Sequence, residues 1–397
     1  MAGASHSDDL DAMRQEALNA ADRISMEELR KSGRQTARER IAMLLDADSF
    51  VEVDSFVQHR SGDFNMHLHR PYGDGVVAGH GKIDGRRVVC FAQDYAVFDG
   101  TMGEMHARKI AKVAEFAEKS QLPLVGIWDG DGQRVQDGVP ALGATGELLD
   151  ILVACSGRIP TFSIILGTVA GVSALAAGLS DFVILSDDHG QMFMRSPYFI
   201  PEIASGELDQ NSLGGADAHA SRSGVACMVA EDEEDAILTA IEILSFLPDH
   251  TLAEAITLSS GDPADRACKT LTDIVPADSN IPYDIRKVIT EVVDEGRFLE
   301  LFSTYAENIV IGFARLDGQS VGIVANQPKV LAGCLDIDAS VKAARFIRTC
   351  DIFNIPVVTF VDVPGFLPGT VQEWGGIIRH GAKLLYAYAE ATVPKLT

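Results

Sequence analysis

Short apolar runs that open on a proline are the most regular feature of this chain. The clearest follow Pro123, Pro160 and Pro356. Apolar runs of this length, without alternation, predict strands buried on both faces, as in a parallel sheet. The segment from His106 to Lys119 instead repeats apolar residues with helical spacing. The pattern therefore predicts an α/β fold.

The stretch from Arg158 to Phe182 joins one of these strands to a small-residue turn and an Ala/Leu-rich segment. That composition predicts a helix beginning near Gly171. The first N–H groups of a helix have no partner inside it and lie at the positive end of its dipole. If they faced a cleft, they would stabilise an oxygen that becomes negative. An ordinary strand-turn-helix, in which small residues only permit close packing, also explains the stretch.

The loop that begins at Asp129 is a second candidate site. It follows the apolar strand that opens at Pro123. Ligands of open α/β sheets bind beyond the carboxyl ends of the strands. We therefore expect this loop to lie at a binding site.

Two polar features have simpler interpretations. His67 and His69 form an H-x-H pair, but without nearby cysteines in a Pro/Gly-rich context we interpret them as surface histidines. The acidic run from Glu231 to Asp235 opens a predicted helix, and we interpret it as a solvated helix start.

Composition narrows the function without identifying it. The chain has 397 residues, enough for two domains, and a formal net charge of −24. So acidic a balance argues against binding nucleic acid or anionic membranes. We expect no signal peptide and no bilayer-spanning run. The six scattered cysteines indicate reduced thiols of a cytoplasmic protein.

An internal repeat divides the chain. Residues of the first half return 233 positions later, namely Asp84 as Asp317, Lys109 as Lys342, Pro123 as Pro356 and Asp129 as Asp362. A constant shift across two strands, a helix and a third strand predicts two homologous ββα domains. The Pro-rich polar segment 248–280 separates them, so we assign residues 1–255 and 256–397 to the two domains.

The second copy is expected to be incomplete. Pro160 corresponds to Pro394 with one residue inserted, and the sequence given ends at Thr397. The second glycine turn and helix start would therefore lie beyond it.

At this point the chain resembles a known family, the carboxyltransferase (beta) subunits of biotin-dependent acyl-CoA carboxylases of the propionyl-CoA carboxylase type. The resemblance extends from Ala37 onward. Its most specific motifs are residues 37–41 (Ala-Arg-Glu-Arg-Ile), 213–216 (Leu-Gly-Gly-Ala), 326–328 (Asn-Gln-Pro), 360–369 (Phe-Val-Asp-Val-Pro-Gly-Phe-Leu-Pro-Gly) and 375–383.

The resemblance implies two crotonase-like (ββα superhelix) domains, the second incomplete. It implies transfer of a carboxyl group from carboxybiotin to the α carbon of a short-chain acyl-CoA, without a metal. Biotin would be carried on a separate protein, the biotin carboxylase or biotin carboxyl carrier subunit, and the carboxyltransferase subunits would form an oligomer, usually a hexamer. The residues implied are the oxyanion donors Gly171 and Val172, the acyl-CoA loop Gly132, Gln133, Arg134, Val135 and Gln136, and the biotin-side loop Phe366, Leu367, Pro368 and Gly369.

Three departures from the family pattern leave alternatives open. The family's Asp-Ser-Gly-Gly-Ala-Arg loop here gains a carboxylate, Asp131, and its Gly-Gly donor pair is Gly171-Val172. The third departure is the segment beyond Thr397. A biotin-independent decarboxylase of a carboxyacyl-CoA and a non-catalytic paralogue within a carboxylase complex are therefore alternatives. The sequence leaves the preferred acyl chain undetermined.

Overall fold

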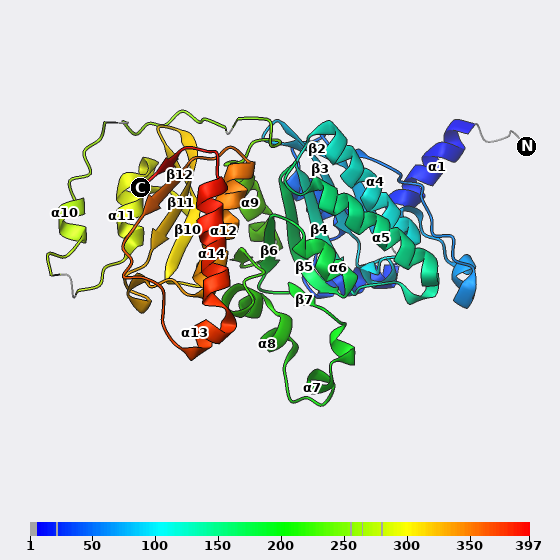
Figure 1. The fold of residues 1–397 in the computed structure, drawn as a ribbon. Coiled ribbons are helices and arrows are strands. Elements are labelled where there is room, and N and C mark those ends of the chain that lie inside the picture. Colours follow the sequence, from blue (N-terminus) through cyan, green and yellow to red (C-terminus); the bar gives the residue numbers. More distant parts are fainter. Residues whose placement is uncertain (1–5, 21–22, 255, 264, 279–280) are drawn as a thin grey trace, which may run out of the picture. The chain divides into compact units, whose positions relative to one another are not determined.

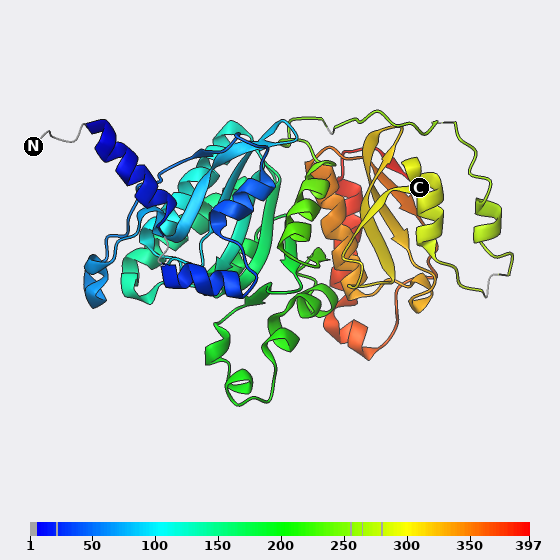
Figure 2. The ribbon, with the colours of Figure 1, turned by 180° about the vertical axis from the view of Figure 1, so that it is seen from behind.

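The computed structural model describes residues 6–20, 23–254, 256–263, 265–278 and 281–397, and it divides into two units (Figure 1; Figure 2). The first comprises Met1–His219 and Val229–Ile241, and the second Ala220–Met228 and Glu242–Thr397. Residue 255, at which the sequence places the domain boundary, lies outside the described residues, so that boundary stays a prediction.

The first unit is built on a sheet ordered β1-β2-β3-β4-β5-β6-β8, with β7 paired to β5. The strands are β1 (Val51–Glu52), β2 (Val76–Ile83), β3 (Arg86–Gln93), β4 (Leu124–Gly130), β5 (Thr161–Ala170), β6 (Phe182–Ser186), β7 (Gln191–Phe193) and β8 (Met228–Ala230). Strands β2 and β3 form an antiparallel hairpin about Asp84-Gly85, and both turn residues have positive φ. From β3 to β6 the pairing is parallel, in agreement with the uninterrupted apolar runs.

Helices α4, α5 and α6 lie on one side of this sheet (Figure 1). The helices associated with the unit are α1 (His6–Leu18), α2 (Arg23–Lys31), α3 (Ala37–Leu44), α4 (Glu104–Ser120), α5 (Gly138–Cys155), α6 (Val172–Gly178), α7 (Pro201–Ala204), α8 (Gln210–Gly214) and α9 (Glu233–Leu244). The predicted helix start near Gly171 is confirmed, since Gly171 is the N-cap of α6.

Helix α5 contradicts one prediction made from the sequence, that no run is apolar and long enough to span a bilayer. The segment Val135–Cys155 has 21 residues and is apolar enough, by length and composition, to cross a membrane, contrary to our expectation of no such run. Buried helices of other proteins meet the same criterion. Here α5 packs against α4 through buried positions such as Ala144 and Leu148, while Val139 and Leu142 are exposed.

The second unit is a five-stranded sheet ordered β13-β12-β11-β10-β9. Its strands are β9 (Phe298–Leu301), β10 (Ile309–Leu316), β11 (Gln319–Asn326), β12 (Val357–Phe360) and β13 (Lys395–Leu396), and its helices are α10 (Leu271–Ile274), α11 (Ile285–Val292), α12 (Ile337–Ile352), α13 (Thr370–Gly375) and α14 (Ile377–Glu390). Helix α11 lies on one face of the sheet, and α12 and α14 pack together on the other (Figure 1).

Strand registers confirm the internal repeat. Corresponding pairs are Val76↔Gln93 with Ile309↔Asn326, Val89↔Leu124 with Gly322↔Val357, and Leu124↔Thr161 with Val357↔Lys395. The shift is 233 residues up to β12. It becomes 234 at β13, in agreement with the single insertion before Pro394.

A buried lysine is repeated as well. Lys109 Nζ donates to Val76 O at 2.7 Å, and Lys342 Nζ donates to Ile309 O at 2.8 Å. Burial lowers the pKa of Lys109 to about 8 and that of Lys342 to about 7. Each lysine ties a helix to the first strand of its ββα unit, so the repeat preserves polar contacts in addition to the sheet.

Candidate active site

The carboxyl ends of β4 and β5 bring two predicted site segments together. Gly130 pairs with Val169, and Gly132 follows with a φ of 78°. A Cβ at Gly132 would lie 3.2 Å from Ala170 O, closer than most side-chain contacts. The loop can therefore approach the end of β5 this closely because residue 132 is glycine.

The Gly171 amide is not available as predicted. It donates to Phe193 O at 2.9 Å, which extends the pairing of β5 with β7 by one residue. The sequence analysis did not predict β7, because a strand of three residues is too short to show a pattern of apolar residues. The correction removes the Gly171 N–H from the predicted donor pair. The Val172 N–H is the first of α6, and it has no hydrogen-bond acceptor among the described residues.

Gln133 presents a second amide on this loop. Met102 holds the residues on both sides of Gln133. The Met102 N–H donates to Gly132 O at 2.8 Å, and the Met102 carbonyl accepts from Arg134 N at 3.0 Å. The Gln133 side chain also donates to Met102 O at 2.8 Å. The backbone N–H of Gln133 has no acceptor within the described part of the chain. The loop is thus held while one of its amides stays available.

Arg134 has an internal role. It is buried, pairs with Asp74, donates to Thr101 O at 2.9 Å and lies over the Phe98 ring. Its guanidinium is therefore engaged inside the protein, which does not fit the prediction that this side chain contacts acyl-CoA. Val135 and Gln136 are exposed, and their predicted contact with acyl-CoA stays a prediction.

A buried ionic network holds Asp129, which lies near the end of β4, where the loop begins. Arg40, on α3, donates to Asp129 at 2.7 Å and pairs with Glu233 at the start of α9, and Arg34 also pairs with Asp129. Burial alone would lower the pKa of Arg40, but the Asp129 and Glu233 carboxylates outweigh it and raise that pKa. The solvated interpretation of the acidic run was wrong for Glu233, because this carboxylate neutralises a buried arginine.

Gln93 and His106 complete the support. Gln93 Oε1 accepts from Asp129 N at 3.0 Å, and Gln93 Nε2 lies 3.2 Å from His106 Nε2. His106 Nδ1 lies 3.0 Å from Asp74 O, so it donates there while Nε2 accepts from the Gln93 amide. Burial lowers the pKa of His106 to about 3, with the Arg134 charge adding to the effect. A neutral imidazole is the form that this network requires.

The biotin-side loop of the second unit is open. It is aligned by Leu335, whose N–H donates to Gly365 O at 3.0 Å and whose carbonyl accepts from Leu367 N at 2.8 Å. Phe366, Pro368 and Gly369 are exposed, and Leu367 is half-buried. Nearby in the same unit, Asp362, the counterpart of Asp129, accepts from the Tyr283 hydroxyl at 2.8 Å. The repeat therefore keeps the aspartate but not its buried arginines.

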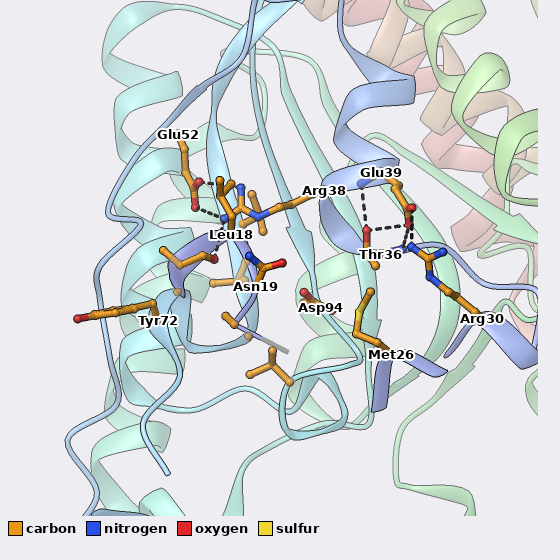
Figure 3. Close-up of a pocket in the computed structure, with 17 residues that line it drawn as sticks. Leu18, Asn19, Met26, Arg30, Thr36, Arg38, Glu39, Glu52, Tyr72 and Asp94 are labelled. Atoms are coloured by element: carbon orange, nitrogen blue, oxygen red, sulfur yellow. Dashed lines mark hydrogen bonds and ion pairs between the residues drawn. The ribbon is translucent and has the colours of Figure 1, made fainter. Parts of the chain in front are cut away.

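A separate cavity of about 150 Å³ lies beside α3 in the first unit (Figure 3). Its charged lining is paired internally. Arg38 forms a bidentate contact with Glu52, and Glu39 accepts from Thr36 in a capping box. None of the predicted site residues lines it, so we assign it a structural role.

No group of three or more His, Cys, Asp or Glu side chains in the described residues is arranged to hold a metal. The predicted surface position of His67 and His69 is confirmed, because both are exposed.

The two ββα units, together with the structural match to transcarboxylase 12S given below, show a carboxyltransferase of the crotonase-like fold. Residues 28–397 match the carboxyl transferase domain family, and the chain belongs to that family.

Close relatives carry different activities in their names. The chain is 51% identical to the methylmalonyl-CoA decarboxylase subunit alpha of Veillonella parvula over 94% of this chain and 73% of the relative. It is 50% identical to the propionyl-CoA carboxylase beta chain of Saccharopolyspora erythraea over 98% and 73%. A crystal structure of the transcarboxylase 12S hexamer with hydrolysed methylmalonyl-CoA bound superposes with a TM-score of 0.95 at 42% identity, covering 100% of this chain and 77% of that one.

Proposed function

We propose that this chain transfers a carboxyl group from carboxybiotin to the α carbon of a short-chain acyl-CoA such as propionyl-CoA. The observation that carries the proposal is the pair of unpartnered amides, Val172 N–H and Gln133 N–H, in the two segments that meet at the ends of β4 and β5. Removing the α proton of a thioester makes its oxygen negative, and fixed amide donors stabilise that charge. Propionyl-CoA carboxylase beta chains among the relatives support this substrate class.

The residues at the carboxyl ends of β4 and β5 have distinct proposed roles. Val172 and Gln133 donate to the thioester oxygen and replace the Gly171-Val172 pair. Val135 and Gln136, both exposed, contact the acyl-CoA. The buried Arg40–Asp129 pair keeps the loop in place, because Asp129 is the penultimate residue of β4, after which the loop begins.

Biotin fits the open loop of the second unit. When bound, carboxybiotin supplies the carboxyl group, and we propose that a separate carrier protein of the cytoplasm delivers it. Gly365 and Gly369 have positive φ, and a Cβ on either would meet only open space. A flat ring could thus approach the backbone closely, with Phe366 exposed beside it.

Exposed apolar side chains on two helices support the formation of an oligomer. Helix α5 presents Val139 and Leu142 to solvent, and its counterpart in the repeat, α14, presents Ile378 and Leu385. Apolar patches of this kind mark protein interfaces. We propose that these faces are covered by other carboxyltransferase subunits, in a hexamer like that of transcarboxylase 12S.

The substitution Val172→Pro tests the donor assignment. Proline is tolerated at the first position of a helix, so the change removes the N–H while keeping α6. We expect carboxyl transfer between methylmalonyl-CoA and biotin to fall by roughly 10²–10³-fold, the usual effect of losing one oxyanion donor. Val172→Ala keeps the N–H and should remain close to wild type. Equal activity of the two variants would refute the assignment, and a folded chain that does not bind propionyl-CoA in isothermal titration would refute the function.

Decarboxylation of a carboxyacyl-CoA is the second candidate. The Veillonella relative is named for that activity, and the same donors would stabilise the enolate that loss of CO₂ leaves. An assay of CO₂ release from methylmalonyl-CoA without biotin separates it from carboxyl transfer.

A further inference from the structure

Asp131 carries a carboxylate oxygen with no hydrogen-bond partner in the described structure. Oδ1 is shielded from solvent and unpaired, and Oδ2 lies 3.5 Å from Ser196 Oγ. Buried polar atoms are nearly always hydrogen-bonded, so an exception needs an explanation. Ser196 lies on the segment after β7, and this contact is too long to satisfy the carboxylate.

The position of Asp131 is fixed by both neighbours. Gly130 is paired with Val169, and Gly132 approaches Ala170 O. Asp131 therefore sits opposite the last residues of β5, which lead directly to Val172. In the pattern of the family that the sequence resembles, this position is glycine. The chain thus places an ionisable group where the usual family loop has glycine, in the loop that carries the Gln133 amide.

The surroundings of Asp131 disfavour its charged form. Burial raises the pKa of Asp131, the Asp99 carboxylate on the 3₁₀ turn Phe98–Gly100 raises it further, and the Ser196 hydroxyl opposes both. A protonated carboxyl group has a hydrogen to donate, and an unpaired oxygen leaves that hydrogen without an internal acceptor. The remaining acceptor for this hydrogen is a ligand bound at the carboxyl ends of β4 and β5.

Resting on the proposed function, we infer that Asp131 is the proton donor to the α carbon of a thioester enolate, so that this chain decarboxylates 2-carboxyacyl-CoA esters without biotin. The bond between the α carbon and the carboxylate breaks, CO₂ leaves, and the electron pair remains as the enolate. The Asp131 O–H proton then forms the new C–H bond, and the carboxylate regains a proton from solvent. Oxidant, reductant and metal take no part in this balance.

The test uses the full chain with methylmalonyl-CoA and no biotin, measuring CO₂ release, and with propionyl-CoA in D₂O, measuring α-deuterium by mass spectrometry. General acid catalysis contributes roughly 10²–10⁴-fold, so Asp131→Asn and Asp131→Gly should each lose at least about 100-fold in both assays. Affinity for propionyl-CoA, titrated separately, should stay within about threefold. The control Asp84→Asn, in the exposed turn between β2 and β3 and outside the site, should retain most activity.

A pH profile distinguishes a proton donor from a residue that only shapes the loop. The wild-type decarboxylation rate should fall as pH rises through the pKa of Asp131, and the residual rate of Asp131→Asn should lack this limb. Wild-type rates in Asp131→Asn, or no decarboxylation and no exchange by a wild-type chain that binds propionyl-CoA, would overturn the inference and leave the proposed function standing. Absence of propionyl-CoA binding by the wild type would overturn both.

Discussion

Replacing Arg40 with methionine removes the centre of the ionic network beneath the active-site loop. Arg40 is fully buried and contacts Asp129 and Glu233, which lie 89 and 193 residues away in the chain. Methionine keeps an apolar stem of similar length, so few packing contacts are lost. Two buried carboxylates lose a cation, and among the described residues Asp129 alone retains another, from Arg34.

The expected cost follows from burial. Removing one partner of a buried ion pair costs about 3–5 kcal/mol. The first unit has roughly 230 residues, and in a domain of this size 1 kcal/mol lowers the melting temperature by about 2–4 °C. We therefore expect the Arg40→Met unit to melt about 6–20 °C below wild type. Its acyl-CoA affinity should fall as well, because Asp129 is the penultimate residue of β4, the strand that leads into the loop.

Scanning calorimetry of Arg40→Met beside Arg158→Met provides the measurement. Arg158 pairs with Glu118 on the surface, with 64% of its side chain exposed, and exposed pairs contribute at most about 1 kcal/mol. The control should melt within about 4 °C of wild type. If the two variants melt within about 2 °C of one another, the buried network stabilises the unit no more than an exposed ion pair does.

Three further experiments test His106, two glycines and the exposed face of α5. Because His106 stays neutral with a pKa near 3, the unfolded chain binds its proton more tightly between pH 6.5 and 3, so stability falls as pH drops through that window. Urea unfolding at pH 7 and pH 5 should show this loss, and in His106→Gln the loss should be smaller by about 2 kcal/mol. Gly100→Ala should destabilise the fold severely, since its Cβ would lie 2.0 Å from Asp129 O, whereas Gly143→Ala, in open space on α5, should raise stability by up to about 1 kcal/mol. Circular-dichroism melts that rank these two alanine variants the other way would contradict the geometry. Leu142→Lys should lower the assembled mass in light scattering by placing a charge on the exposed apolar face of α5, and an unchanged mass would exclude that face as an interface.

Local pattern was sufficient for much of the fold. The apolar runs after Pro123 and Pro160 form β4 and β5, and the segment with helical spacing from His106 to Lys119 lies in α4. The constant shift of 233 residues predicted a second unit with matching registers. Each of these features depends on residues close together in the chain or on a direct comparison of its two halves.

The site was harder to predict, because hydrogen bonds to distant residues determine which of its groups remain available to a ligand. The sequence indicated unpaired amides near Gly171, but whether an amide is free depends on the strand beside it, and β7 engages Gly171. Arg134 looked like a loop residue available to ligand, yet Asp74, 60 residues away in the chain, holds it inside. The unsatisfied oxygen of Asp131 could be recognised only once its surroundings were known.

The sequence by itself determined that this protein is a doubled ββα scaffold with strands buried on both faces and a glycine turn at a helix start. Tertiary structure alone decided which amides remain available, which charges are buried in pairs and which acid is left without a partner. The physical reason is that apolar periodicity is a property of neighbouring residues, whereas hydrogen-bond satisfaction depends on groups that only folding brings within 3 Å of one another.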